Sequence, residues 1–349
     1  MKIALITGSC GLVGSESATF FSKKGFKIIG IDNNYRKVFF GKDGDISWLR
    51  NKLKKELKNY KHFNTDIRNF INLKKIFKKY QKNISLVIHA AAQPSHDWAK
   101  NKVFIDFDIN AKGTLNLLEL TRLYCPEAPF IFMSTNKVYG DNPNLLPLIE
   151  KKTRWEIKGN HKFKSGIDES MAIDNCTHSF FGASKSYADI IVQEYGKNIG
   201  LKTACFRAGC ITGPKHSGAK LHGFLSYLVK TSLQSKKYFL IGYKGKQVRD
   251  NIHSNDLVSC FWEYYKKPGY GEVFNMGGGK YSNCSIIEAL NMVENIAGIK
   301  IKKKILKQNR VGDHIWYISN TKKFKKKYPN WKQKFSTRKI ITELIDQFS

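Results

Sequence analysis

The sequence predicts an α/β protein built on a doubly wound parallel sheet, because short apolar strands alternate with helical segments over much of its 349 residues. The clearest case is at the start, where an apolar run from Met1 to Thr7 leads through a glycine-rich turn into a helical stretch that ends at Lys24. A chain of this length can bury a large core and still carry an additional lobe. We therefore expect one large α/β domain with a smaller lobe attached.

The turn after the first strand has the spacing Gly-x-x-Gly-x-x-Gly. Glycine is needed here because a dinucleotide pyrophosphate must come close to the backbone, where unpaired N–H groups at a helix N-terminus receive its charge. A side chain would hold the pyrophosphate away. We therefore predict a dinucleotide site formed by Gly8, Gly11, Leu12, Val13 and Gly14.

Asp32 follows the second expected strand, Lys27 to Ile31. A carboxylate at this distance from the last glycine can bond both hydroxyls of the adenine ribose and repel a 2′-phosphate, so it favours NAD over NADP. Arg36 is close enough in the sequence to accommodate such a phosphate, which keeps the second cofactor open. Asn33 and Arg36 join Asp32 as candidate cofactor residues.

Further strands are expected at His62 to Asp66, Ser85 to His89 and Pro129 to Ser134, with helices at about Leu73 to Lys79 and Val103 to Tyr124. Ligands bind at the carboxyl ends of strands in such sheets, so the residues there are candidate contacts. They are Asp66, Ile67, Ala90, Ala91, Ala92, Gln93, Ser134, Thr135 and Asn136. Two alternatives remain open, since Asp66 could cap the next helix and the alanines could serve only for packing.

Composition argues against several classes of function. Sixty Lys and Arg against 28 Asp and Glu give a formal net charge of +32, which attracts anionic substrates, but the lysines are spread along the chain and do not predict a specific nucleic-acid site. The seven cysteines form no C-x-x-C pair, so neither a disulfide framework nor a metal site is indicated. No apolar run approaches the roughly 20 residues of a membrane helix. We expect a cytoplasmic protein without a membrane partner.

A series of motifs runs in order along nearly the whole chain: Thr7-Gly8-x-x-Gly11-x-x-Gly14, Asp66-Ile67-Arg68, His89-Ala90-Ala91, Ser134-Thr135, Gly182-x-Ser184-Lys185, Arg207, Arg249-Asp250 and Arg310-x-x-Asp313. In this order the chain resembles the extended short-chain dehydrogenase/reductase superfamily, and within it the nucleotide-sugar epimerases. Two longer segments, Ser134 to Gly140 and Gly245 to Asp250, resemble the CDP-sugar 2-epimerases. The resemblance implies a Rossmann-like domain with bound NAD, and a nucleoside-diphosphate sugar, preferably a CDP-linked deoxysugar, inverted at C2 through a 2-keto intermediate.

The resemblance also implies roles for single residues. Thr135 matches the Ser/Thr that hydrogen-bonds the reacting hydroxyl, and Lys185 matches the lysine that binds the nicotinamide ribose and lowers the pKa of the neighbouring acid. Arg249 matches a group that holds the substrate diphosphate, because its planar fork suits phosphate oxygens. Each has an alternative: Thr135 could be a helix cap, Lys185 a surface lysine and Arg249 a salt-bridge partner of Asp250.

Other positions are carried over from the family in the same way. The resemblance places Arg310 and Asp313 beside the substrate diphosphate and ribose. It adds Asn110, Ser134, Phe181 and Lys185 to the cofactor site, and Gln93, Thr135, Asn136 and Arg207 to the substrate site.

Position 181 departs from the family pattern. The frame from Phe181 to Lys185 is that of the Tyr-x-x-x-Lys pair used for proton transfer, but phenylalanine carries no hydroxyl. We favour a native Phe181 with another proton route, through Thr135, a water held by Lys185, or His178. Two alternatives stay open: an engineered Tyr-to-Phe variant, and a protein that binds NAD and sugar nucleotide without turnover.

The related 4,6-dehydratases and reductases would use the same motifs. Dehydratases of this type present an acidic residue just after the Ser/Thr, whereas this chain has Asn136 there, which argues against elimination.

The two parts of the fold are expected to interleave along the chain. We assign residues 1–209 and 242–267 to the NAD-binding domain, and residues 210–241 and 268–349 to a smaller substrate lobe. The helical stretches Val103 to Tyr124 and Ser184 to Tyr195 resemble the pair through which this family forms a four-helix dimer interface, so we expect a homodimer.

Overall fold

The computed structural model describes residues 2–216, 223–306 and 312–349. The chain forms two compact units, which are Met1–Val138, Phe180–Arg207 and Val258–Phe274 in the first, and Tyr139–Ser179, Ala208–Leu257 and Asn275–Ser349 in the second. The second unit therefore includes residues 139–179, 208–209 and 242–257, which were predicted to belong to the NAD-binding domain, and the first includes residues 268–274, which were predicted to belong to the substrate lobe. The assignment of one part to the cofactor and the other to the substrate stays a prediction. No helix within the described ranges is long and apolar enough to cross a bilayer.

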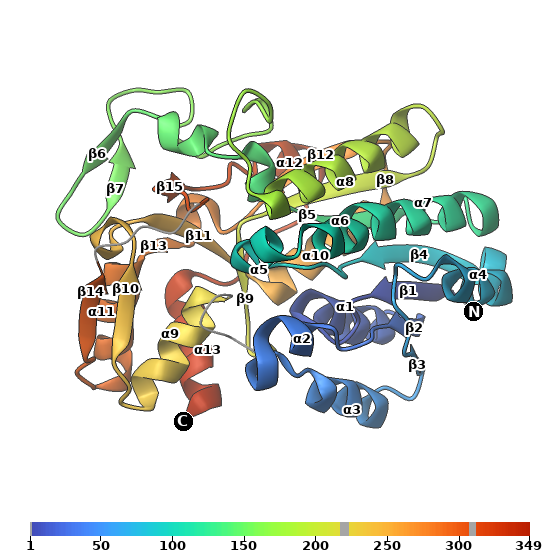
Figure 1. Cartoon of the computed structure of the whole chain (residues 1–349), viewed down its shortest axis with the longest axis horizontal. Helices are drawn as coiled ribbons and strands as arrows, with labels where there is room; N and C mark the ends of the chain where they lie inside the picture. The colour runs from blue at the N-terminus through green and yellow to red at the C-terminus, as the bar shows by residue number, and fades with distance from the viewer. Residues whose placement is uncertain (1, 217–222, 307–311) are drawn as a thin grey trace. The chain divides into compact units, whose positions relative to one another are not determined.

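The central sheet has seven strands in the order β12-β8-β5-β4-β1-β2-β3 (Figure 1). Its strands are β1 (Ile3–Thr7), β2 (Lys27–Ile31), β3 (Tyr60–Phe63), β4 (Ile84–His89), β5 (Phe130–Thr135), β8 (Thr203–Ala208) and β12 (Glu272–Met276). β1 pairs in parallel with both β2 and β4, so the chain reverses its direction of growth at β1. The carboxyl end of β1 is thus the switch point where such sheets bind ligands. The predicted doubly wound, Rossmann-like fold is confirmed.

Helices cover the sheet in two sets. α1 (Leu12–Lys23) packs on β1 and β2 and contacts α3 (Ser47–Glu56), whereas α4 (Phe70–Tyr80), α7 (Gly113–Tyr124) and α8 (Phe180–Lys197) contact one another in a row, with α8 against β5. Figure 1 shows α6 and α7 following one another in one line, with α8 alongside them. The shorter helical segments of this part are α2 (Arg36–Phe40), η1 (Gly41–Gly44), η2 (Gln81–Asn83), α5 (His96–Asn101), α6 (Val103–Phe107), the π-helical turn η3 (Asp108–Lys112) and η4 (Asn136–Tyr139).

Because helices cover it, the sheet buries its strands almost completely. Leu5, Ile29, Val87, Phe130 and Phe132 are fully buried in one apolar cluster. A strand that is covered on both faces is apolar at nearly every position, whereas a strand with one exposed face alternates apolar and polar residues. The apolar runs in the sequence therefore indicated a sheet covered on both faces.

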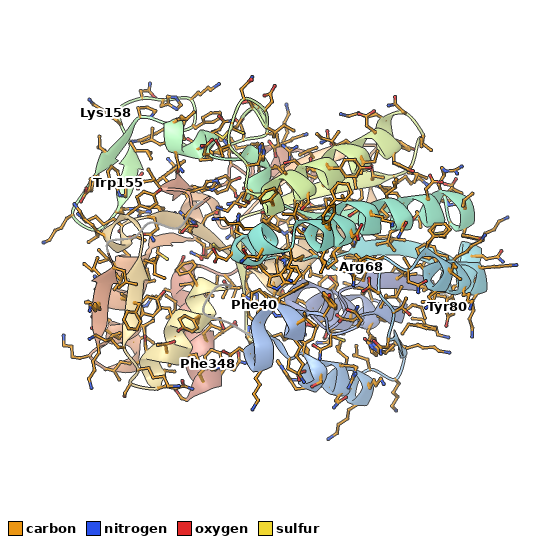
Figure 2. All side chains as sticks on the ribbon, viewed as in Figure 1. Phe40, Arg68, Tyr80, Trp155, Lys158 and Phe348 are labelled. Atoms are coloured by element: carbon orange, nitrogen blue, oxygen red, sulfur yellow. The ribbon has the colours of Figure 1, made fainter. Side chains whose placement is uncertain are left out.

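The second unit contains smaller sheets and its own apolar core. Its strands are β6 (Leu148–Glu150), β7 (Trp155–Ile157), β9 (Cys210–Thr212), β10 (Tyr238–Ile241), β11 (Val248–His253), β13 (Asn283–Ser285), β14 (Lys303–Leu306) and β15 (Trp316–Tyr317). Its helical segments are η5 (Asn142–Leu145), α9 (Phe224–Leu233), η6 (Tyr243–Gly245), η7 (Gly279–Tyr281), α11 (Ile286–Ala297), α12 (Lys322–Lys327) and α13 (Thr337–Phe348), while α10 (Ser254–Lys266) begins here and continues into the first unit. Figure 2 labels Trp155 and Lys158 at the hairpin of β6 and β7.

Two predicted elements differ from the structure. The third strand is Tyr60–Phe63 and not 62–66, because the chain turns at Asp66, where the carboxylate accepts the backbone N–H of Arg68. The helix expected over 103–124 is continuous in direction but changes to a π-helical turn at Asp108–Lys112. Such turns are frequent at functional sites, and this one carries Asn110.

Candidate active site

The glycine turn after β1 forms a cradle that only glycine can line. A Cβ atom on Gly8, whose φ is +64°, would lie 2.7 Å from the backbone nitrogen of Ala91, and one on Gly14 would lie 2.0 Å from the carbonyl oxygen of Gly8. Gly11 is the N-cap of α1 and provides no side-chain cap. The first-turn N–H groups, at Leu12, Val13 and Gly14, therefore need acceptors from outside the helix, as a pyrophosphate would supply.

The three alanines predicted as contacts follow β4 beside this cradle. Ala90 and Ala91 form the wall against Gly8, and the Ala91 N–H donates to the Thr7 hydroxyl at 3.3 Å. Ala92 continues the same loop and is half-buried. Small side chains here allow close packing at the switch point.

Asp32 lies at the carboxyl end of β2, as predicted. Its carboxylate accepts the backbone N–H groups of Cys10 (2.9 Å) and Asn34 (2.8 Å). Burial raises the pKa of this carboxyl, and the two N–H groups oppose the rise. A pocket at the carboxylate is also lined by Arg50 and His62, and the buried Nε atom of Arg50 has no hydrogen-bond partner.

Asp66 does not cap the helix that follows it, because Asn69 caps α4 by accepting the N–H of Asn72. Asp66 instead pairs with Arg68, labelled in Figure 2, at 2.7 Å and accepts a hydrogen bond from the Asn33 side chain at 2.9 Å. Asn33 and Asp66 therefore join the ends of β2 and β3.

Two further residues predicted to contact the cofactor lie nearby in the sequence. Ile67 is buried and packs in the main apolar cluster. The Arg36 guanidinium lies 4.7 Å from the ring centre of Phe40, and burial lowers the pKa of Arg36 to about 10.

Lys185 is buried on α8, with 3% of its surface exposed, so it is not a surface lysine. Its Nζ donates to the carbonyl oxygen of Met133 at 2.7 Å and lies 4.0 Å from the ring centre of Phe132. Burial lowers the pKa of Lys185 to about 7, opposed mainly by the negative charge of Asp189. Burial therefore works against the charged form of this amine.

Thr135 and Asn136 end β5 and begin η4. The Thr135 oxygen accepts the backbone N–H of Lys137 at 3.2 Å, and its hydroxyl donates to Asn136 Oδ1 at 3.4 Å. Thr135 therefore caps this turn, and the same contacts fix where its hydroxyl points.

A buried polar network holds α8 in place. Its centre is Asp106, whose carboxylate accepts hydrogen bonds from Ser184 (2.6 Å), Gln93 (3.0 Å) and Asn110 (3.1 Å). Burial raises the pKa of Asp106 to about 6, with the Ser184 hydrogen bond opposing the rise. Gln93 and Asn110 were predicted as ligand contacts, but their side chains are occupied in this network. Asp106 could not be identified from the sequence, because its neighbours give no signal that it is buried.

His89 links the same region to the switch point. Its Nδ1 lies 2.8 Å from the Thr7 hydroxyl and its Nε2 lies 2.9 Å from the Thr114 hydroxyl. The Thr114 hydroxyl donates to the carbonyl of Asn110, so it must accept from Nε2–H, and Nδ1 accepts from Thr7. Burial holds the pKa of His89 well below its usual range, which keeps the ring neutral.

Arg207 and Ser134, whose predicted contacts with ligands stay predictions, both bond to one buried carboxylate. The Arg207 guanidinium pairs with Asp189 at 2.7 and 3.1 Å, and the Ser134 hydroxyl donates to the same group. This arrangement gives Arg207 a structural role between β8 and α8.

In the second unit, the structure brings together Arg249 and Asp313, whose side chains form an ion pair at 3.3 Å. Asp250 is not the partner of Arg249, because its carboxylate accepts the backbone N–H groups of Gly279 and Ser319. Arg310, predicted beside them, lies outside the described residues.

Two histidines bear on the missing hydroxyl at position 181. His178, the predicted alternative acid, is half-buried, with Nδ1 3.6 Å from the Cys176 sulfur. His96, which the sequence analysis did not identify, lies against Phe181 itself, with ring centres 4.8 Å apart. Residues 96 and 181 are too far apart in the sequence for any local pattern to have linked them.

Within the described part of the chain, no group of three or more His, Cys, Asp or Glu side chains is arranged to hold a metal ion.

Residues 4–277 match the family described as the NAD dependent epimerase/dehydratase family. The chain belongs to this family. It is 31% identical to CDP-paratose 2-epimerase from Salmonella typhi, over 99% of this chain and 98% of that protein. It is 27% identical to UDP-glucuronate 4-epimerase from Thermodesulfobacterium geofontis, over 99% and 96% of the two chains. A crystal structure of dTDP-glucose 4,6-dehydratase from Bacillus anthracis in complex with NAD superposes with a TM-score of 0.77 at 22% identity, covering 100% of this chain and 96% of that one.

Membership of the epimerase/dehydratase family makes the chain an enzyme of that kind, with NAD as its cofactor. The residues present fit NAD, because the glycine cradle admits a pyrophosphate and Asp32 offers a carboxylate to the adenine ribose. The predicted resemblance to nucleotide-sugar epimerases and the predicted cofactor are both confirmed.

We expect Gly14→Ala to destabilise the fold by about 1–3 kcal/mol and to lower NAD occupancy, because the new Cβ would overlap the Gly8 carbonyl. Urea denaturation and the NAD content of the purified protein measure the two effects. Gly200→Asn is the control, since a Cβ there meets nothing within 4 Å and asparagine tolerates a φ of +81°. Normal NAD content in Gly14→Ala would contradict the assignment of the cradle.

We expect Asp32→Ala to weaken NAD binding by about 10- to 100-fold, because charge-assisted hydrogen bonds to the ribose are lost. Binding of NADP should weaken less or improve, since the repelling charge is removed and Arg50 remains in the pocket. Calorimetric titration of both cofactors checks this. An equal loss of affinity for NAD and for NADP would show that Asp32 does not contact the adenine ribose.

Proposed function

We propose that the protein is an NAD-dependent nucleotide-sugar epimerase that inverts C2 of a CDP-linked deoxysugar through transient oxidation to a 2-keto intermediate. The similarity to CDP-paratose 2-epimerase, which extends over 99% of the chain, supports this substrate class.

The observation that carries the choice of epimerisation over elimination is Asn136. Elimination of water needs a group beside Thr135 that can act as an acid, and the N–H groups of a carboxamide are far too weakly acidic to do so. Asn136 is buried and its side-chain oxygen accepts from Thr135. Its chemistry suits holding a polar substrate group and not acid catalysis.

When bound, NAD would supply the proposed reaction with an acceptor for the hydride of C2 and with the donor that gives it back. The chain holds the cofactor with the glycine cradle, Asp32 and Lys185. The Thr135 hydroxyl, held by the Lys137 N–H, binds the reacting C2 hydroxyl. The Lys185 ammonium, whose pKa of about 7 is lowered by burial, adds a positive charge that favours proton removal from the substrate.

We assign the substrate diphosphate to Arg249. The guanidinium is paired with Asp313 at 3.3 Å, which is a long ion pair for arginine and carboxylate. The substrate diphosphate carries more negative charge than Asp313 and would compete with it for the Arg249 guanidinium. Asp313 could then accept hydrogen bonds from the hydroxyls of the substrate ribose. Arg310 remains part of this proposal.

The test is to incubate the purified chain with CDP-, UDP- and GDP-linked sugars while following the products by NMR and the absorbance of the bound cofactor. Inversion at C2 without net NADH supports the proposal. A keto-deoxy product would instead identify a 4,6-dehydratase, a reduced sugar formed at the expense of NADH would identify a reductase, and tight binding without product would identify a binding protein that lacks turnover.

We expect Phe181→Tyr to raise kcat, because it restores the hydroxyl that the family frame places four residues before Lys185. General acid–base catalysis contributes about 10²- to 10⁴-fold, which bounds the gain. Steady-state rates on the accepted nucleotide sugar measure it. Loss of turnover in Phe181→Tyr would mean that the pocket performs a different proton transfer.

We further propose that the protein is a homodimer that packs through the outer faces of α6, α7 and α8. This surface exposes large apolar side chains, with Phe104 at 88% and Ile190 at 45% exposure, together with Phe107, Leu123 and Tyr187. Exposed large apolar side chains on neighbouring helices favour an interface, and the family resemblance indicates a second copy of the chain.

We expect Phe104→Glu to convert the dimer to a monomer, because burying a carboxylate in the interface is unfavourable. Light scattering during size-exclusion chromatography reports the mass. Val38→Glu, at a 58% exposed position on α2, serves as the control and should stay dimeric. A wild-type protein that is monomeric at all concentrations would refute the interface.

A further inference from the structure

The proposed epimerisation needs a group that takes the proton from the C2 hydroxyl, and position 181 cannot supply it. Phe181 is buried, with 7% of its surface exposed, and lies one helical turn before Lys185 on α8. Its ring therefore occupies the place where the family frame puts the tyrosine ring. Any replacement for the phenol must reach this ring.

The structure places an imidazole there. His96 is the first residue of α5 (His96–Asn101), which lies against α8, and its ring meets the Phe181 ring at an interplanar angle of 65° with centres 4.8 Å apart. At this separation the two rings are in contact edge to face. The imidazole is thus adjacent to the ring that lacks the hydroxyl.

The position of His96 is fixed by its own loop. The preceding residue, Ser95, caps α5 by accepting the N–H of Trp98, and the Ser95 N–H donates to the Gln93 side chain. Gln93 is held in turn by Asp106, the centre of the buried network. A side chain mounted on so constrained a turn can act at a defined place.

Two other polar side chains of this region, Ser184 and Lys185, donate to buried acceptors. Ser184 donates to the Asp106 carboxylate, which also accepts hydrogen bonds from Gln93 and Asn110. Lys185 donates to the Met133 carbonyl. Imidazole is the side chain best suited to accept and return a proton near neutral pH.

We propose that His96 is the general base and acid that replaces the missing tyrosine in this chain. The inference rests on the proposed function. As the C2–H bond breaks and its electron pair leaves as hydride to NAD, an imidazole nitrogen takes the proton of the C2 hydroxyl and the C2=O bond forms. When hydride returns to the other face, the imidazolium gives the same proton back to the oxygen, and the ring ends neutral.

The test is a double-mutant cycle of His96→Gln and Phe181→Tyr. We expect His96→Gln to lower kcat by about 10²-fold or more when position 181 is phenylalanine, and to have little effect in the Phe181→Tyr background, where a phenol can do the same work. Equal losses in both backgrounds would assign His96 a structural role and overturn the proposal. A loss with His178→Gln but not with His96→Gln would also overturn it.

Two controls separate catalysis from folding. NAD content and the melting temperature should match between His96→Gln and the parent protein, and His161→Gln, in the loop after β7, should leave all rates unchanged. A second readout needs no turnover: the Cε1 NMR signal of His96 should titrate at a different pH in Phe181→Tyr than in the parent, because the new phenol can hydrogen-bond the imidazole, while the signal of His161 stays constant.

An unchanged His96 titration would show that the imidazole does not reach the hydroxyl position, which would overturn the proposal. If none of the variants converts any nucleotide sugar, the proposed function fails, and the NMR comparison still decides the placement of His96.

Discussion

The buried carboxylate of Asp106 is the constraint on which the geometry of the site depends. It receives hydrogen bonds from the loop after β4, from the π-helical turn and from α8, through Gln93, Asn110 and Ser184. Removing such a group would leave several buried donors unsatisfied at once, each at a cost of about 1–3 kcal/mol. The network therefore fixes the position of Phe181 on α8 relative to the loop that follows β4.

A second buried carboxylate, Asp189 on α8, also holds this helix in place. Asp189 is fully buried and binds both Arg207 and Ser134, so it joins β8 and β5 to the helix. Asp189 on α8 and Asp106 on α6 both place negative charge near Lys185. Burial lowers the pKa of the Lys185 amine and the two carboxylates raise it. The effect of burial is larger, so the pKa is lowered to about 7.

The parts of the site that were recognised from the sequence are those with local causes. Gly8 and Gly14 are required by contacts within a single turn, and Asp32 is placed by the end of the next strand. The buried partners of Gln93 and Arg207 gave no local signal in the sequence, and the prediction that these two residues contact the substrate rests on the family motif alone. The Gln93 side chain donates to Asp106, 13 residues away in the sequence, and the Arg207 guanidinium pairs with Asp189, 18 residues away. Both partners are close in space because of the way the helices pack on the sheet.

The sequence by itself determined the alternation of strands and helices, the cofactor and the absence of a hydroxyl at Phe181, because each is written in residues close together along the chain. Only the tertiary structure decided that Lys185 is buried, that Arg249 meets Asp313 and that His96 lies against Phe181. Burial and contact between distant segments depend on how helices pack on the sheet, and no local pattern of residues records that packing.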